Sequence, residues 1–141
     1  MKKTEMLKKN YEFRKVLSKG KYYSGKYIEA LILSNTKKKN ALGIAINTKL
    51  GKAVERNRIK RLFRESYYFF EQNLIDGQEI VLLWKKKKPI EKANFQNIKE
   101  DMQNIFDKAK IINKDEKNFN KNNLMVSKTY IRRVTAQKYN V

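Results

Sequence analysis

The sequence predicts an α+β fold, a single-domain α-β sandwich with the element order α-β-β-β-α-β-α. Segments with helical periodicity alternate with short apolar runs that are typical of strands, and no linker or internal repeat interrupts them. The chain has 141 residues and 40% hydrophobic content, which suits one domain with one core. We therefore expect a folded domain over residues 1–112.

The first predicted element is a short helix over residues 10–19. Asn10 can cap its start, and Gly20 follows at the position where helices commonly end. One face of this helix is apolar, with Phe13, Val16 and Leu17. The spacing of these residues supports the helical assignment.

A short strand and two longer ones follow the first helix. After a short extended piece and a break at Gly25, residues 27–33 form an apolar run with strand character. Residues 41–47 are strand-like again, because they are small and β-branched. The polar stretch 35–40 between them therefore predicts a hairpin loop.

The second half of the domain is predicted to be helix, strand and helix. Residues 52–73 have helical periodicity, and residues 78–84 read "QEIVLLW", which is typical of a buried strand. Residues 90–109 repeat apolar side chains at helical spacing. Pro89 stands just ahead of them, where proline favours a helix start.

The last segment, residues 113–141, has a different composition. It is rich in Asn and Lys and carries seven Lys or Arg against two acidic residues. We expect a mobile basic tail, because its apolar residues lack a strong period. A sequence-independent RNA-binding arm and a tail without a specific role both stay open.

The charge of the chain points to a polyanionic partner. There are 34 Lys and Arg against 14 Asp and Glu, a formal net charge of +20. A compact domain with this charge repels itself unless a polyanion screens it, so nucleic acid is the first candidate partner and an acidic membrane the second. The sequence has no run of 18 apolar residues and no secretory signal pattern, which predicts a cytoplasmic protein without membrane attachment.

The composition also narrows the chemistry of the side chains. The chain contains no His and no Cys, which excludes catalytic histidines, thiolate nucleophiles and the usual zinc ligands. Its acidic residues are scattered or adjacent in pairs, so their spacing predicts no metal cage. A two-metal site made by folding stays a minor alternative. We expect no catalytic residue and no protein-bound metal.

The stretch "KAVERNRIKRLFRES" at 52–66 carries the densest pattern. A helical projection at 100° per residue sorts it into two faces. The apolar face contains Ile59, Leu62, Phe63, Ser66, Tyr67, Phe69 and Phe70. The basic face contains Asn57, Lys60, Arg61 and Arg64, with Arg56 and Arg58 flanking it.

This sorting favours a phosphate-binding face over a solvated one. From residue 49 to residue 64 there are seven basic residues and one acid, Glu55. Like charges at helical spacing cost about 0.2 to 0.5 kcal/mol per pair, so local stability would not select them. Arginine offers a planar fork to phosphate and stacks on exposed bases. The helix-turn-helix pattern of DNA readers is missing, and the neighbouring strands favour RNA.

The same motif, with Lys49 and Gly51 just ahead of it, resembles the signature of the bacterial ribonuclease P protein family. Members of that family show Arg-Asn-Arg followed by Lys-Arg and another Arg. The stretch "LKKNYEFRKVLSKG" is similar to the first helix of the family. The stretch "VLLWKKKKPIEKANFQNIKEDMQNIF" resembles its closing strand, basic turn with proline, and last helix. The resemblance covers about residues 5–110.

The resemblance implies a division of labour. In this family the RNA subunit is the catalyst and cleaves the 5′ leader from precursor tRNA with magnesium ions. The small basic protein binds the RNA and the leader. We therefore expect magnesium to enter through the RNA subunit, and one protein per RNA subunit. The family fold also implies a left-handed β-α-β crossover around the motif helix, although general topology favours the right-handed form.

The resemblance also assigns residues. The RNA-binding positions that match the family motif or add charge at its entrance are Lys49, Lys52, Arg56, Asn57, Arg58, Lys60, Arg61 and Arg64. The cleft for the leader would contain Phe13, Leu17 and Leu31, where the family commonly has aromatic residues. The two leucines weaken the expectation of base stacking. Tyr22, Tyr23 or Tyr27 could compensate, or each could be structural.

Two functions remain after this reasoning. The first is the protein subunit of ribonuclease P, which assists removal of the leader from precursor tRNA. The second is a non-catalytic RNA-binding protein, such as a ribosomal protein, with the same charge pattern.

Overall fold

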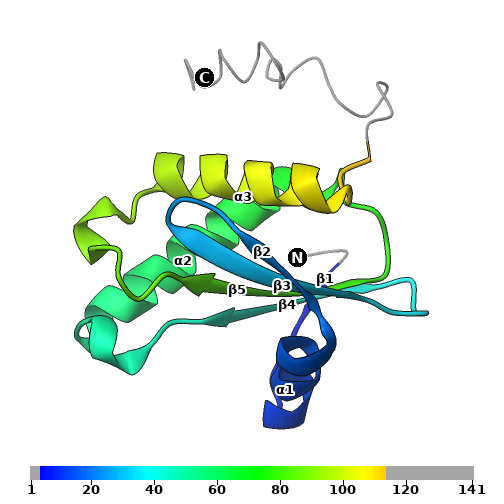
Figure 1. The fold of residues 1–141 in the computed structure, drawn as a ribbon, viewed down its shortest axis with the longest axis horizontal. Helices are drawn as coiled ribbons and strands as arrows, with labels where there is room; N and C mark the ends of the chain where they lie inside the picture. Colours follow the sequence, from blue (N-terminus) through cyan, green and yellow to red (C-terminus); the bar gives the residue numbers. More distant parts are fainter. Residues whose placement is uncertain (1–3, 114–141) are drawn as a thin grey trace. The chain divides into compact units, whose positions relative to one another are not determined.

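The computed structural model describes residues 4–113 (Figure 1). Residues up to Ile111 form one compact unit. The tail predicted over residues 113–141 lies outside the described residues, apart from Asn113. The elements are β1 (Thr4–Met6), α1 (Asn10–Lys19), β2 (Lys21–Ser24), β3 (Ile28–Ser34), β4 (Asn40–Ala45), the 3-10 turn η1 (Thr48–Leu50), α2 (Ala53–Glu71), β5 (Gln78–Trp84), the 3-10 turn η2 (Ile90–Lys92) and α3 (Phe95–Ala109).

The five strands form one mixed sheet in the order β1-β4-β5-β3-β2. β5 is the central strand, parallel to β4 and antiparallel to β3. The hairpin predicted around residues 35–40 is therefore wrong, because β5 lies between the two strands that this loop connects. The physical reason lies in β5 itself. Six of its seven residues are buried, so the strand gains most from neighbours on both sides.

β4, α2 and β5 form the β-α-β unit expected from the motif. The two parallel strands lie side by side, with Ala45 opposite Leu83 near their carboxyl ends. α2 is the connection between them. The left-handed sense of this crossover stays a prediction.

The main core lies between the sheet and the helices α2 and α3, which cover the same face (Figure 1). Side chains of both helices and of the central strands are fully or nearly fully buried there, among them Ile59, Phe63, Tyr67, Phe70, Ile80, Leu82, Ile98, Met102, Ile105 and Phe106. Phe106 packs edge to face against Tyr67 and Phe70, with ring centroids 6.4 Å and 5.7 Å apart. Packing of this kind favours a single arrangement of the two helices.

Two helix starts differ from the prediction. α1 begins after Lys9, and Asn10 is its first residue and not its cap. Glu12 accepts the backbone N–H groups of Lys8 and Lys9 at 2.9 Å and 3.0 Å, so its carboxylate satisfies the helix start. These hydrogen bonds lower the pKa of Glu12.

The last helix also begins later than predicted. Residues 90–92 form the turn η2, and α3 begins after Asn94, whose side chain accepts the Asn97 N–H at 2.8 Å. Periodicity extended across this break because Ile90 and Ala93 happen to continue the apolar pattern. Asparagine is a favoured helix N-cap, so Asn94 begins a new helix and separates it from residues 90–92.

The first strand, β1, was not predicted from the sequence. It is three residues long and pairs with the start of β4. The hydroxyl groups of Thr4 and Tyr67 form a buried hydrogen bond of 2.8 Å, which links this edge to α2. Burial raises the pKa of Tyr67 to about 12. A three-residue strand carries too little periodicity to be detected in a sequence.

The opposite face of the sheet is covered by α1 alone among the described helices (Figure 1). α1 crosses the sheet over β3 and β5. Val16 is fully buried beneath it, whereas Leu17 is 43% exposed. This face is therefore only partly closed.

Candidate nucleic-acid interface

α2 separates its side chains as the helical projection predicts. Ile59, Phe63, Ser66, Tyr67 and Phe70 are buried. The predicted apolar arc is too wide at its margins, because Leu62 is half-buried and Phe69 is 36% exposed. The basic residues occupy the remaining surface of the helix.

The predicted RNA-binding residues all retain access to solvent. Lys49, Lys52, Asn57 and Arg61 are exposed, and Arg56, Arg58, Lys60 and Arg64 are half-buried. Asn57 stands inside the helix, well past its start, so it does not act as a cap. The structure thus places these eight residues on and just before one helix. Their contacts with RNA stay a prediction.

The single acid of the motif has a structural task. Glu55 accepts the backbone N–H of Lys52 at 2.8 Å and so satisfies the start of α2. Its carboxylate is directed to the backbone. Its negative charge therefore lies at the start of the helix, where the helix dipole favours it.

Two of the arginines also brace the loops around the helix. Arg56 donates to the carbonyl oxygens of Gly51 and Thr48 at 2.6 Å and 3.2 Å, which holds the turn that carries Lys49. Arg58 donates to the Ala93 carbonyl oxygen at 3.1 Å and links α2 to the segment before α3. Replacing either residue would disturb structure as well as charge. Sequence reasoning treated both as contacts only.

Arg61, Lys60 and Arg64 form the central part of the basic face. Arg61 lies 4.0 Å from the Glu65 carboxylate, and both side chains are about half exposed. An exposed pair at this distance is worth little, because solvent screens it and the side chains lose entropy. These cations therefore remain available to an external polyanion.

A second group of basic residues lies near the start of α2, at the carboxyl ends of β4 and β5. Because β4 and β5 are parallel, the start of α2 and the lysine run 85–88 both follow strand ends at this edge. A Cβ atom added at Gly51 would lie 3.2 Å from Ile90, so the two connecting segments are close together. The lysines were not assigned to the site from sequence. The sequence did contain a pattern that could have identified them, because four lysines directly after a buried strand place positive charge at the end of that strand.

The three predicted cleft residues lie on the α1 side of the sheet. Phe13 lies over Gly43, where an added Cβ would come within 2.6 Å of the ring. Gly43 and Leu31 are both register partners of Val81, so all three share one face. Leu17 lies one helical turn after Phe13 on α1. The structure thus brings Phe13, Leu17 and Leu31 to the same face, and Leu31 is half-buried.

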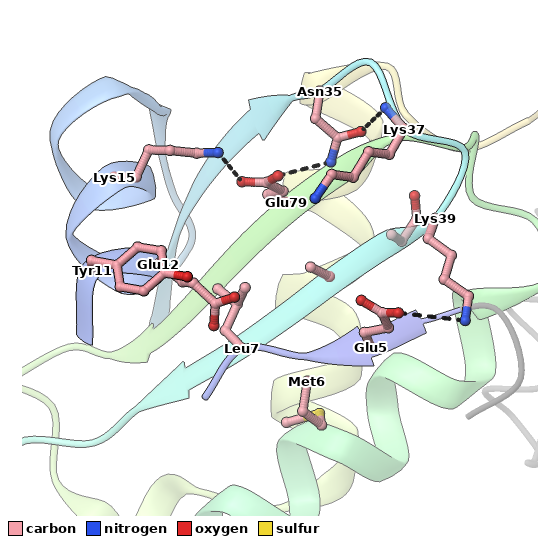
Figure 2. A pocket seen from close by; sticks show the side chains of 12 residues that line it. Glu5, Met6, Leu7, Tyr11, Glu12, Lys15, Asn35, Lys37, Lys39 and Glu79 are labelled. Carbon is pink, nitrogen blue, oxygen red and sulfur yellow. Dashed lines mark hydrogen bonds and ion pairs between the residues drawn. The ribbon is translucent and has the colours of Figure 1, made fainter. Parts of the chain in front are cut away.

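A hollow of about 170 Å³ is lined by residues of β1, α1 and β4 (Figure 2). Its charges are mixed. Lys15 pairs with Glu79 at 3.6 Å, and Lys39 pairs with Glu5 at the same distance. Asn35 also donates to Glu79 at 2.9 Å. This hollow has internal charge balance, in contrast to the basic face of α2.

Within residues 4–113, no three acidic side chains are grouped so that they could hold a metal ion. In the same part of the chain, no helix is long and apolar enough to cross a membrane. The described surface features are therefore a basic helix face, a partly open sheet face and a small hollow with balanced charge.

These features define a small basic α+β protein with a basic helix face beside a partly open sheet face. Comparison with known proteins gives the family. The family model described as Ribonuclease P matches residues 1–110, which is most of the chain. The chain belongs to the ribonuclease P protein family.

Individual relatives agree with this assignment. The ribonuclease P protein component of Clostridium acetobutylicum is 35% identical over 118 residues, covering 82% of this chain and 98% of the relative. The component of Dictyoglomus turgidum is 37% identical over 112 residues, covering 79% of this chain and 94% of the relative. These relatives disfavour the alternative of a ribosomal protein.

Solved structures share the fold. The RNase P protein of Staphylococcus aureus superposes with a TM-score of 0.68 at 26% identity, covering 77% of this chain and 97% of that chain. The RNase P protein of Thermotoga maritima has a TM-score of 0.66 at 28% identity, with coverage of 74% and 96%. The predicted α+β fold class is therefore confirmed.

Proposed function

We propose that this protein is the subunit of ribonuclease P that binds the catalytic RNA through the basic face of α2 and the 5′ leader of precursor tRNA on the α1 side of the sheet. In this role it assists the cleavage that gives mature tRNA 5′ ends. The observation that carries the proposal is the sorting of α2. Its apolar side closes the core, while the family motif is displayed on the accessible side.

The positive charge of the motif suits a folded RNA. Arginine forks bind phosphate through two parallel hydrogen bonds, and each phosphate contact releases counterions. Lys49, Lys52 and the lysine run 85–88 extend the charge along one edge of the sheet. The proposed RNA-binding surface therefore includes the segment before α2 and the segment after β5 as well as α2 itself.

The bond-breaking chemistry belongs to the RNA subunit in this proposal. The chain has no His and no Cys, and its role is to hold RNA and substrate. Magnesium ions would be held by the RNA, where they activate water and stabilise the leaving oxygen. One protein per RNA subunit and action in the cytoplasm complete the proposal.

The test is reconstitution of the enzyme. The purified protein is combined with its cognate RNA subunit at low magnesium concentration, and cleavage of precursor tRNA is measured. We expect faster cleavage with the protein than with the RNA alone, because the protein's cations replace part of the magnesium that the RNA needs. Equal rates with and without the protein would contradict the proposal.

A further inference from the structure

The α1 side of the sheet carries an aromatic residue, Tyr22, whose position beside Leu31 could not be predicted from the sequence alone. Two positions that are commonly aromatic in the family are Leu17 and Leu31 in this chain. In the structure, Tyr22 on the edge strand β2 is the direct register partner of Leu31 on β3. Directly paired residues of neighbouring strands lie on the same face of a sheet, with Cβ atoms about 4.5 to 5.5 Å apart. Tyr22 therefore stands beside Leu31.

That face is the one covered by α1. Leu31 pairs with Val81, and Val81 pairs with Gly43, over which the ring of Phe13 lies. The chain of register partners connects Phe13 on the helix to Tyr22 at the edge of the sheet. Tyr22 thus lies on the α1 side of the sheet, as the three predicted residues do.

The ring of Tyr22 is exposed and also held in place. Its side chain is 53% exposed. Its hydroxyl donates to the Glu29 carboxylate at 2.7 Å, and this hydrogen bond raises the pKa of Tyr22. Glu29 precedes Leu31 by two residues on β3 and so shares its face. Because this hydrogen bond already restricts the ring of Tyr22, the ring loses little conformational entropy when a base stacks on it.

Three other tyrosines among the described residues are engaged or lie elsewhere. Tyr27 already stacks on Trp84, with ring centroids 5.6 Å apart and planes within 7°. Tyr23 follows Tyr22 in β2 and so faces the opposite side of the sheet. Tyr11 lines the hollow formed by β1, α1 and β4. Of these four tyrosines, Tyr22 is the one with an exposed ring beside Leu31.

We propose that Tyr22 stacks on an unpaired base of the 5′ leader and takes the place of the aromatic residues absent at positions 17 and 31, with Glu29 as the residue that positions its ring. This inference rests on the proposed function. The base would then stack at the edge strand β2 and not at positions 17 and 31. The leader would then cross β3 over Leu31 and reach β2.

The test compares two ligands with the reconstituted holoenzyme. Dissociation constants are measured for precursor tRNA with a leader of several nucleotides and for mature tRNA without one. Stacking on one base is worth about 1 to 3 kcal/mol, so Tyr22→Ala should weaken binding of the precursor by about fivefold to a hundredfold. Binding of mature tRNA should not change.

Two further variants separate stacking from structure. Tyr22→Phe keeps the ring and should keep most of the affinity for the leader, whereas Glu29→Ala should cause a smaller loss than Tyr22→Ala. Tyr11→Ala is the matched control, because Tyr11 is 59% exposed and lines the charge-balanced hollow and not the β2 edge of the sheet. Thermal unfolding of each variant reports any damage to β2.

The outcomes are distinguishable. Equal affinities of Tyr22→Ala and the unmodified protein for precursor tRNA would overturn the inference. An equal loss for precursor and mature tRNA would overturn it as well. If the unmodified protein itself fails to stimulate cleavage, the proposed function fails and not only the role of Tyr22.

Discussion

The two faces of the sheet differ in how completely they are covered. On one face, α2 and α3 bury Ile80 and Leu82 completely. On the other, α1 buries Val16 but leaves Leu17, Leu31 and Tyr22 accessible to different degrees. The first face therefore carries most of the stability, and the second is available for a ligand. A single sheet can serve both purposes because its side chains alternate between the faces.

The largest effect should come from the closed face. Phe106 is fully buried and contacts the rings of Tyr67 and Phe70. Phe106→Ala should lower the free energy of unfolding by about 3 to 5 kcal/mol, because it removes apolar contacts and leaves a cavity. Denaturant unfolding measures this. A loss below about 1 kcal/mol would mean that this face does not dominate stability.

A smaller effect is expected where α3 holds the β2–β3 connection. The Asp101 carboxylate is 5% exposed and accepts the backbone N–H groups of Lys26, Tyr27 and Ile28. Asp101→Ala leaves these donors without their acceptor, at a cost of about 1 to 3 kcal/mol in unfolding free energy. β2 carries Tyr22, so affinity for leader-bearing tRNA should fall in the same variant. Unchanged unfolding would contradict this clamp.

On the open face, Leu31→Ala should affect the ligand more than the fold. Leu31 is half-buried, so its truncation should cost less unfolding free energy than Phe106→Ala. Affinity for precursor tRNA should drop while affinity for mature tRNA stays the same. If denaturant unfolding shows the larger change, Leu31 belongs to the core and not to the cleft.

A pH dependence of the unfolding free energy is expected on the closed side. Lys99 is 4% exposed, and burial lowers its pKa to about 8. The unfolded chain then binds more protons than the folded one between about pH 8 and 10.5, so stability should rise with pH in this window. Lys99→Met should be more stable at pH 7 and should lack this part of the rise. Parallel pH profiles for the two proteins would contradict the prediction.

Local patterns in the sequence predicted the presence of the three helices and the solvent-accessible positions of the basic face, but not the exact helix starts, because helical periodicity depends on neighbouring residues. The positions of Ile59 and Phe63 beneath α2 follow from that period alone. Strand order could not be obtained in this way. The insertion of β5 between β3 and β4 depends on long-range pairing, and so does the position of Tyr22 opposite Leu31.

The hydrogen bonds that Arg56 and Arg58 donate to the neighbouring loops also could not be predicted from local sequence patterns. A helical projection assigns Arg58 to the surface but does not show that it reaches the Ala93 carbonyl oxygen. This contact changes which residues test the charge of the basic face. Lys60, Arg61 and Arg64 are better suited, because no hydrogen bond to a distant loop is known for them in the described structure.

The central claim is that the basic face of α2 binds the RNA subunit. The direct measurement is the salt dependence of binding between the protein and that RNA, for the unmodified protein and for the triple variant Lys60→Ala, Arg61→Ala, Arg64→Ala. The matched control removes the same charge at the other end of β4, with Lys37→Ala, Lys38→Ala and Lys39→Ala.

If all three basic-face residues contact phosphates, the slope of log K against log salt should flatten by roughly 2 to 3 in the first variant. The control should keep a slope close to that of the unmodified protein. Equal slopes for the two triple variants would contradict the claim, because the binding would then follow net charge and not the face of α2.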